Sequence, residues 1–203
     1  RSMVFKAAEL LEKADNGHQI SQNIFRIITP LIKFRACRDV RKIAGDAMEI
    51  RGGSGYIEEW LDPKILRDSH LGSIWEGTSN IISLDTIRAL KKDSNIEILK
   101  SNLIQSVQKT KENEHKKTLL HAIEDVFSFV TNEIKDDFTS SSRKISSSLY
   151  YLCASIFLNS EGQYCKSLAN RKKISELLVK YKINKSSPLE RDNLDFDLIK
   201  QFI

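Results

Sequence analysis

Two short segments in the first half of the chain combine residue types that could do acid–base chemistry beside a cofactor. Residues 51–56 read Arg-Gly-Gly-Ser-Gly-Tyr, and residues 74–80 read Ile-Trp-Glu-Gly-Thr-Ser-Asn. Glycines lack a Cβ atom, so the first segment can lie close to another backbone or to a ligand. In the second segment, Glu76 lies beside Trp75, just before an expected helix. Glu76 could therefore act as an acid or base at a helix N-terminus, where free N–H groups can also bind an anion.

Each of these residues also has an ordinary structural explanation. Gly52, Gly53 and Gly55 could end one helix and form the turn after it. Thr78 could cap the next helix by accepting a hydrogen bond from a free N–H group, and Glu76 could interact with the dipole of that helix. A Gly-Gly-x-Gly segment without a preceding strand does not indicate a Rossmann-type site. The residue types alone leave both explanations open.

The elements that must position these residues are helices. Pro30 is expected to kink or restart the second helix, and residues 56–77 are expected to form a loop with one short helical turn at 63–68. Alternation typical of strands never persists, so the sequence predicts an all-α fold. Helices are expected at about residues 3–15, 20–51, 79–92, 96–113, 116–135, 141–159, 163–182 and 189–202.

The composition changes near residue 95, where Lys, Ser, Asn and Ile become frequent and Gly162 is the only later glycine. We therefore expect two helical parts, residues 1–95 and residues 96–203. Cys37, Cys153 and Cys165 have no metal-site spacing, and we expect them to be buried helix residues in a protein from a reducing compartment. No metal binding is predicted. No membrane span is predicted either, because no apolar run approaches the length needed to cross a bilayer.

The net charge of +5 raises the question of nucleic-acid binding. Residues 1–95 carry 15 Lys and Arg against 13 Asp and Glu, and residues 96–203 carry 17 against 14. The excess positive charge is thus spread over both parts, whereas nucleic-acid-binding proteins usually concentrate it on one face or arm. The dispersed charge favours solvated helix faces.

The joint spacing of the motifs resembles the C-terminal helical domain of the acyl-CoA dehydrogenase family. Arg67-Asp68 begins fifteen residues after Gly52, and Glu-Gly-Thr begins nine residues after Arg67. Residues 29–33, Thr-Pro-Leu-Ile-Lys, and residues 47–50, Ala-Met-Glu-Ile, also resemble family members. The similarity covers about residues 1–92 and is greatest to the branch that includes the bacterial alkylation-response flavoprotein.

The resemblance implies a role for each motif in an FAD-dependent acyl-CoA dehydrogenase. Glu76 would be the base that removes the proton next to the thioester carbonyl, and Trp75 would shield it from water. Thr78 and Asn80 would contact the adenine and diphosphate end of FAD, although many members have Gln at the position of Asn80. The three glycines at 52, 53 and 55 would approach the flavin diphosphate of a neighbouring subunit. Arg67 and Asp68 would form a structural ion pair.

The resemblance also implies partners and architecture. It implies a four-helix-bundle-like, up-and-down domain that lacks its first helix, and a homo-oligomer, dimer or tetramer. It further implies an acyl-CoA substrate, electron-transfer flavoprotein as electron acceptor, and a mitochondrial or, in bacteria, cytoplasmic location. The other domains that complete such a site are absent, so we expect the isolated chain to be inactive. Two alternatives are a non-catalytic relative that binds nucleic acid and a module that retains only the oligomer interface.

Overall fold

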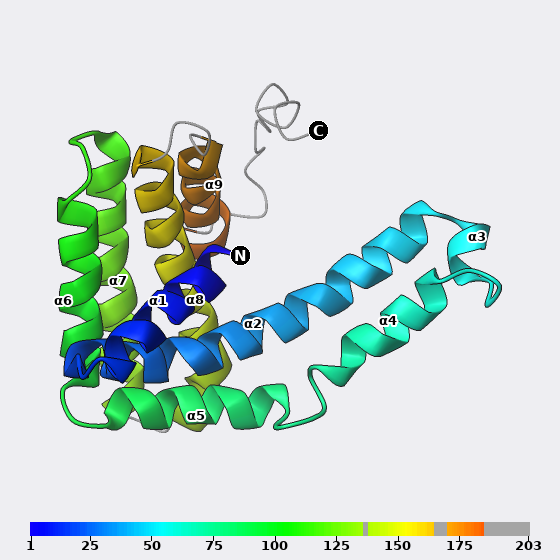
Figure 1. The fold of residues 1–203 in the computed structure, drawn as a ribbon, viewed down its shortest axis with the longest axis horizontal. Coiled ribbons are helices and arrows are strands. Elements are labelled where there is room, and N and C mark those ends of the chain that lie inside the picture. Colours follow the sequence, from blue (N-terminus) through cyan, green and yellow to red (C-terminus); the bar gives the residue numbers. More distant parts are fainter. Residues whose placement is uncertain (136–137, 165–169, 185–203) are drawn as a thin grey trace.

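A computed structural model describes residues 1–135, 138–164 and 170–184. These residues form helices and no strand, which confirms the all-α fold (Figure 1). In chain order the elements are α1 (Ser2–Asp15), α2 (Gln19–Ile50), α3 (Gly53–Tyr56), α4 (Asp62–Leu71), α5 (Ser79–Lys91), α6 (Asn95–Gln108), α7 (Glu114–Lys135), α8 (Phe138–Tyr164), α9 (Asn170–Leu178) and the π-helix η2 (Val179–Ile183). The helix expected at 189–202 lies outside the described residues, as does Cys165.

Most of the molecule is a helical bundle, made of α1, the first half of α2, and α5 to η2. Helices α6, α7, α8 and α9 stand side by side, and α5 and the start of α2 pack across them (Figure 1). Ile27 of α2, Leu103 of α6 and Leu149 of α8 are fully buried in one shared hydrophobic core. The boundary expected near residue 95 falls between α5 and α6, and side chains from both sides enter this core. No helix of the described ranges is long and apolar enough to cross a membrane.

Helix α2 continues through Pro30 without interruption, so the expectation of a restart there is wrong. Proline removes one backbone N–H and leaves the carbonyl group one turn earlier without its helical partner. The buried ring of Pro30 packs in the bundle core region, and Thr29 donates a hydrogen bond to the carbonyl oxygen of Phe25 at 2.8 Å. Tertiary packing around this turn therefore outweighs the local preference of proline.

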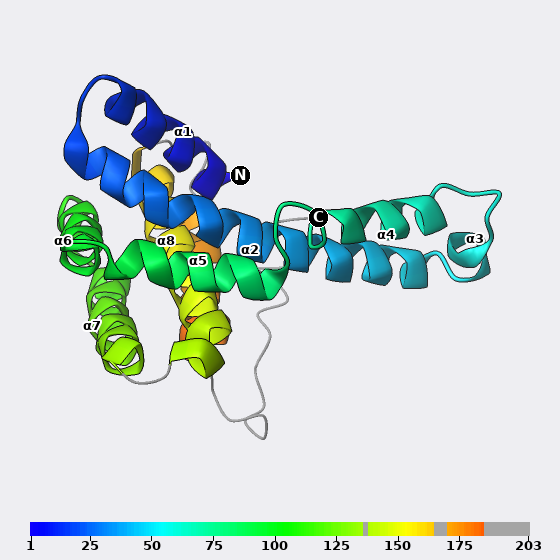
Figure 2. The ribbon, with the colours of Figure 1, turned by 90° about the horizontal axis from the view of Figure 1, so that it is seen from below.

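The second half of α2, α3, α4 and the adjoining loops form an arm, residues 36–78, that extends away from the bundle (Figures 1 and 2). Helix α4 runs back beside α2 and makes its main contacts with α2 and α3. The sequence predicted only a short turn here. Between Ala44 and Ile87 no Val, Leu, Ile, Met, Phe, Tyr or Trp side chain is buried, although Pro63 and Ser69 of α4 are. The large hydrophobic side chains that the arm exposes are Val40, Ile43, Ile50, Tyr56, Ile57, Trp60, Leu61, Ile65, Leu71, Ile74 and Trp75.

Candidate functional site

The glycine segment forms the turn at the far end of the arm. Helix α2 ends at Ile50, and Gly52 has φ +59°, a left-handed conformation that favours glycine. A Cβ atom on Gly55 would lie 2.2 Å from the carbonyl oxygen of Met48, so only glycine fits this close packing of α3 on α2. A Cβ atom on Gly52 or Gly53 would meet nothing within 4 Å. Gly55 therefore has a structural role, while the backbone at Gly52 and Gly53 is open to an approaching group.

Glu76 lies in the loop between α4 and α5, and its carboxylate faces solvent. Its φ is +52°, a left-handed conformation that is uncommon for a residue with a side chain. The Glu76 side chain is 74% exposed, and its nearest cation is the Lys33 ammonium group, 3.9 Å from Oε2. Lys33 also donates a hydrogen bond to the carbonyl oxygen of Trp75 at 2.8 Å. Lys33 thus ties this loop to the middle of α2.

The shielding of Glu76 by Trp75 that we expected is not present within this chain. The indole is itself 56% exposed. The loop joins the arm to the bundle and is bonded to α2 through Lys33 and through the Cys37 carbonyl oxygen, which accepts a hydrogen bond from Ser73. Any cover for the Glu76 carboxylate must therefore come from outside the described residues.

Helix α5 begins where the sequence predicted, with Thr78 at the N-cap position. The Thr78 side chain makes no capping hydrogen bond, so the expected side-chain cap is wrong and the first N–H groups of α5 have no acceptor from it. Gly77 has φ +108° and leads the backbone into the helix. The Asn80 carboxamide oxygen accepts a hydrogen bond from Nε of Arg143 on α8, at 2.5 Å. The expected cofactor contact of Asn80 thus coincides with an existing contact to the second part of the chain.

The structure groups the predicted site residues into two separate sets. Glu76, Thr78 and Asn80 lie together at the start of α5, where Lys33 marks the neighbouring turn of α2. The glycine turn begins just after Ile50. Lys33 and Ile50 are about 26 Å apart along the helix axis, given the rise per residue of an α-helix. The glycines therefore do not reach Glu76 in the same chain.

Arg67 and Asp68 do not pair with each other, which corrects the expected ion pair. Arg67 holds Glu58 through two hydrogen bonds of 2.6 and 3.1 Å, and this raises the pKa of its guanidinium group. Asp68 pairs with Lys64 one turn earlier on α4, at 2.5 Å. Successive residues point to different faces of a helix, which explains why the two charges find separate partners. Both pairs are exposed; one joins α4 to the loop before it, and the other lies within α4.

Of the three cysteines, Cys153 is fully buried as expected. Burial raises the pKa of its thiol to about 12, which makes it a poor nucleophile. Cys37 is half-buried beside Gly72, where a Cβ atom would lie 3.0 Å from its Sγ. Neither cysteine lies among the residues at the start of α5.

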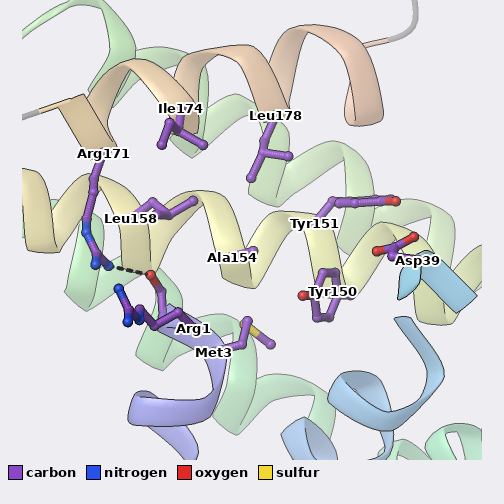
Figure 3. Close-up of a pocket in the computed structure, with 11 residues that line it drawn as sticks. Arg1, Met3, Asp39, Tyr150, Tyr151, Ala154, Leu158, Arg171, Ile174 and Leu178 are labelled. Carbon is purple, nitrogen blue, oxygen red and sulfur yellow. Dashed lines mark hydrogen bonds between the residues drawn. The ribbon is translucent and has the colours of Figure 1, made fainter. Parts of the chain in front are cut away.

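A groove of about 400 Å³ lies on the bundle, away from all the predicted site residues (Figure 3). Its apolar floor comes from α1, α8 and α9, and Asp39 lies at the same end as Tyr150 and Tyr151. At the other end Arg171 donates to Oγ of Ser2 at 2.8 Å and pairs with Glu161. Arg171 is already neutralised there, and Arg1 is a second cationic side chain that lines this end of the groove (Figure 3).

Comparison with known proteins finds a family match for the first part of the chain. The family model described as acyl-CoA dehydrogenase, C-terminal domain, matches residues 1–91. Residues 1–91 are therefore similar to the C-terminal domain of the acyl-CoA dehydrogenase family. The match includes the glycine turn and the Glu76 loop, and it ends with α5.

Two relatives in this family are similar over the same region. Acyl-CoA dehydrogenase family member 11 of Caenorhabditis elegans is 35% identical over 96 residues, which is 46% of this chain and 16% of the relative. The putative acyl-CoA dehydrogenase AidB of Escherichia coli is 39% identical over 83 residues, which is 41% of this chain and 15% of AidB. The AidB match is consistent with the branch that the motifs resemble. The chain spans a small part of either relative.

Solved structures extend the similarity of the fold beyond residue 91. The crystal structure of Caenorhabditis elegans ACDH-11 in complex with C11-CoA superposes with a TM-score of 0.78 at 23% identity, over 90% of this chain and 33% of that one. Bd2924 in its apo form gives a TM-score of 0.66 at 27% identity, over 78% and 30%. The fold of the helices after α5 therefore also occurs in the solved structure of ACDH-11.

Two residues of this acyl-CoA dehydrogenase region and its extension were not singled out from the sequence. Lys33 could have been suspected, because it ends the Thr-Pro-Leu-Ile-Lys segment that resembles family members. Arg143 gave no such signal, since it lies 63 residues from its partner Asn80 in a segment without motifs. A contact of that range depends on how α5 and α8 pack.

Proposed function

We propose that residues 1–91 carry the catalytic base and part of the FAD site of an acyl-CoA dehydrogenase that introduces an α,β double bond into an acyl-CoA thioester. The observation that carries the proposal is the geometry of Glu76. Its carboxylate extends from a left-handed residue directly before the uncapped start of α5. The family of residues 1–91 supports this role, as does the complex of the similar fold ACDH-11 with C11-CoA.

Glu76 would accept the α-proton of the substrate through its carboxylate. A non-glycine residue with positive φ costs free energy, which the surrounding contacts must offset. The hydrogen bond from Lys33 to the carbonyl of Trp75 and the close packing of Gly77 against Ile82 and Ile81 supply such contacts. Together they hold Glu76 in one orientation at the helix start.

The exposure of Glu76 sets a requirement on the complete enzyme. A carboxylate that must remove a weakly acidic proton works best when water is excluded, because burial disfavours its charged form. In this chain water reaches it freely. Another segment of the complete polypeptide, or the acyl chain itself, would therefore cover Glu76 before proton transfer.

The residues present fit the negatively charged end of FAD in two places. The first N–H groups of α5 receive no hydrogen bond from Thr78, so they remain available to an anion. The open backbone at Gly52 and Gly53 would let a diphosphate approach closely. When bound, FAD would accept the hydride from the β-carbon. Since the two places lie at opposite ends of the arm segment of α2, one cofactor would contact the glycines of one copy and Thr78 and Asn80 of another.

The test uses the complete polypeptide that carries this chain, purified with its flavin. We expect the flavin absorption band to bleach when a matching acyl-CoA is added, with electron-transfer flavoprotein as a candidate acceptor for turnover. Glu76→Gln should abolish bleaching while the amount of bound flavin stays unchanged. Glu59→Gln, which removes an exposed carboxylate elsewhere in the arm, is the matched control. A bound flavin that no acyl-CoA of any chain length bleaches would refute the proposal.

The exposed arm favours one alternative, a module that acts mainly by self-association. Contiguous apolar side chains on a surface usually mark a contact with another protein, and the arm carries Ile50, Tyr56 and Leu61 near its far end. Sedimentation of the complete polypeptide would then show a homo-oligomer whether or not flavin is bound. The other alternative, nucleic-acid binding, requires a duplex affinity that falls steeply with salt.

A further inference from the structure

Four arginines meet at the base of the arm, where α2 leaves the bundle and passes the start of α8. Arg35, Arg38 and Arg41 are spaced three residues apart on α2, so they follow one side of the helix with a gradual drift. Arg38 and Arg41 continue the buried stripe of Leu31 and Phe34. The stripe therefore changes from apolar to cationic at the point where the bundle core ends. Arg143 lies on α8 one turn before Ser147, whose Oγ accepts a hydrogen bond from Arg35 at 3.5 Å.

Among the described residues, Arg35 is the one member of the four with a carboxylate partner. It pairs with Asp39 one turn later on α2, and its guanidinium carbon lies 5.0 Å from the centre of the Tyr151 ring. Asp39 and Tyr151 also face the end of the groove on the bundle (Figure 3). Arg35 is therefore part of the bundle surface, and the Asp39 carboxylate is already paired with Arg35.

The other three arginines have no carboxylate partner among the described residues. Arg38 lies over the Phe34 ring, with 5.5 Å between its guanidinium carbon and the ring centre. Arg143 uses Nε for the Asn80 carboxamide and is otherwise exposed. Nε of Arg41 is buried without any hydrogen-bond partner in the described part of the chain. In the part of the chain that the structure describes, the cluster thus holds three guanidinium groups without a carboxylate partner, and Nε of one of them has no acceptor.

The mutual repulsion of these groups is visible at Arg38. Burial lowers the pKa of the Arg38 guanidinium group, and so do the charges of Arg143, Arg35 and Arg41, whereas Asp39 opposes them. Like charges held this close destabilise one another unless an anion lies between them. A site that gathers cations without matching carboxylates is therefore complementary to a negatively charged ligand.

We propose that Arg38, Arg41 and Arg143 bind a compact phosphate-bearing anion at the junction of α2 and α8. Planar guanidinium groups donate paired N–H bonds whose spacing matches two oxygens of one phosphate. The cationic site is small, because these residues gather at one junction while the rest of the positive charge is dispersed over the chain. A small site suits a compact anion better than an extended polyanion. Such a ligand would bridge residues 1–91 to the later helices, next to Asn80. The anion could be free phosphate or the diphosphate of a nucleotide.

Anion binding at this site can be tested apart from the proposed dehydrogenation, because its measurement needs neither flavin nor acyl-CoA. The complete polypeptide, freed of flavin, is titrated with inorganic phosphate, pyrophosphate, ADP and a short DNA duplex by calorimetry and thermal unfolding. We expect saturable binding of phosphate or pyrophosphate that weakens as salt rises. Tighter binding of ADP than of pyrophosphate would assign the anion to a nucleotide, and equal binding would assign it to free phosphate.

Arg38→Gln and Arg143→Gln are the deciding variants, and Lys42→Gln is the matched control. Lys42 lies one turn beyond Arg38 on α2 and is paired with Asp46, so its variant removes the same charge from the same helix. We expect each arginine variant to weaken binding about tenfold or more, and Lys42→Gln about twofold or less. Arg38→Gln should not lower the unfolding temperature without ligand, because it relieves repulsion. Arg38→Lys keeps the charge without the fork and tests geometry.

Three results would overturn the proposal. The first is the absence of saturable binding of any of the small anions. The second is equal binding by the native protein, Arg38→Gln and Arg143→Gln. The third is binding of the duplex alone with sensitivity to Arg38, which would assign the cluster to nucleic acid instead of a compact anion.

Discussion

The bundle and the arm share the long helix α2, yet its apolar residues are buried in the bundle and exposed in the arm. In the bundle half of α2, Ile24, Ile27 and Leu31 are buried in a core that several helices share. In the arm half, Ile43 and Ile50 are exposed by 65% and 87%. The arm is therefore a helical hairpin with one thin contact face, whereas the bundle is a complete core.

Under the proposed function, this difference places the reacting groups in the arm. The glycine turn and the Glu76 loop both belong to the arm, and both present open groups: backbone at Gly52 and a carboxylate at Glu76. An isolated two-helix hairpin buries too little surface to be stable alone, and its apolar side chains gain free energy when another surface covers them. The bundle supplies the anchor, and the proposed function assigns the reacting groups to the arm.

The largest expected effect comes from replacing a buried leucine of the bundle by alanine, compared with the same replacement in the arm. Leu103→Ala removes a fully buried side chain of α6, and the free energy of unfolding should fall by about 2–5 kcal/mol. Leu61→Ala removes the same group from the arm, where it is 71% exposed, and should change that free energy by about 0.5 kcal/mol or less. Urea titration followed by circular dichroism measures both. A large effect of Leu61→Ala would mean that a second copy covers the arm in solution.

A pair of glycine variants tests the packing of the arm itself. Gly55→Ala places a Cβ atom against the Met48 carbonyl and should destabilise the arm by about 1–3 kcal/mol. Gly53→Ala meets open space in the short helix α3 and should be neutral or slightly stabilising, because alanine restricts the unfolded chain. Hydrogen exchange of α3 and α4 amides reports these local changes. Equal exchange in both variants would show that α3 does not pack on α2 as described.

Local rules predicted those elements whose stability is mainly local. The apolar repeat gave α1 and α5 within one residue at either end, and Pro63 marked the start of α4. Local rules failed where contacts with distant parts of the chain determine the structure. Pro30 stays inside α2 because bundle packing holds it.

The candidate site divides in the same way. Residue types at short spacing were enough to select Glu76, Thr78 and the glycines as candidates. Their exposure was not predictable, because Trp75 next to Glu76 in sequence suggested shielding, whereas the direction of the loop depends on Lys33. The contact between Asn80 and Arg143 needed the packing of α5 on α8. Roles of the site residues stay predictions until the complete polypeptide is tested.

The bundle should lose stability at low pH through His115. Its Nε2 lies 2.8 Å from Oγ of Ser175, and burial lowers the pKa of the imidazole. Above about pH 6.5 the imidazole is neutral in both states and adds no pH dependence. Below it the unfolded chain takes up a proton that the folded chain resists, so stability falls by up to about 1.4 kcal/mol per pH unit.

His115→Gln should remove this part of the pH dependence of thermal unfolding. His121→Gln is the control, because His121 is exposed on the same helix and lies 3.3 Å from Asp125. If His115→Gln and the native protein lose stability with the same slope between about pH 6.5 and pH 5, carboxylates rather than His115 control the acid response. His70 is the one histidine of the arm, and it is exposed at the end of α4. The expected change of stability with pH therefore arises in the bundle.

The smallest effect concerns the loop that joins the two regions. Lys33→Met keeps the apolar stem but removes the hydrogen bond to the Trp75 carbonyl, which should loosen the Glu76 loop by about 1 kcal/mol or less. Both tryptophans of the chain, Trp60 and Trp75, lie in the arm and are about half exposed. Tryptophan emission and its quenching therefore report on the arm, while circular dichroism reports mainly on the bundle. Lys33→Met should increase quenching without shifting the dichroism melt, and Lys42→Met should change neither. A lower melting temperature with unchanged quenching would place Lys33 among the bundle contacts and leave the orientation of Glu76 to the left-handed turn alone.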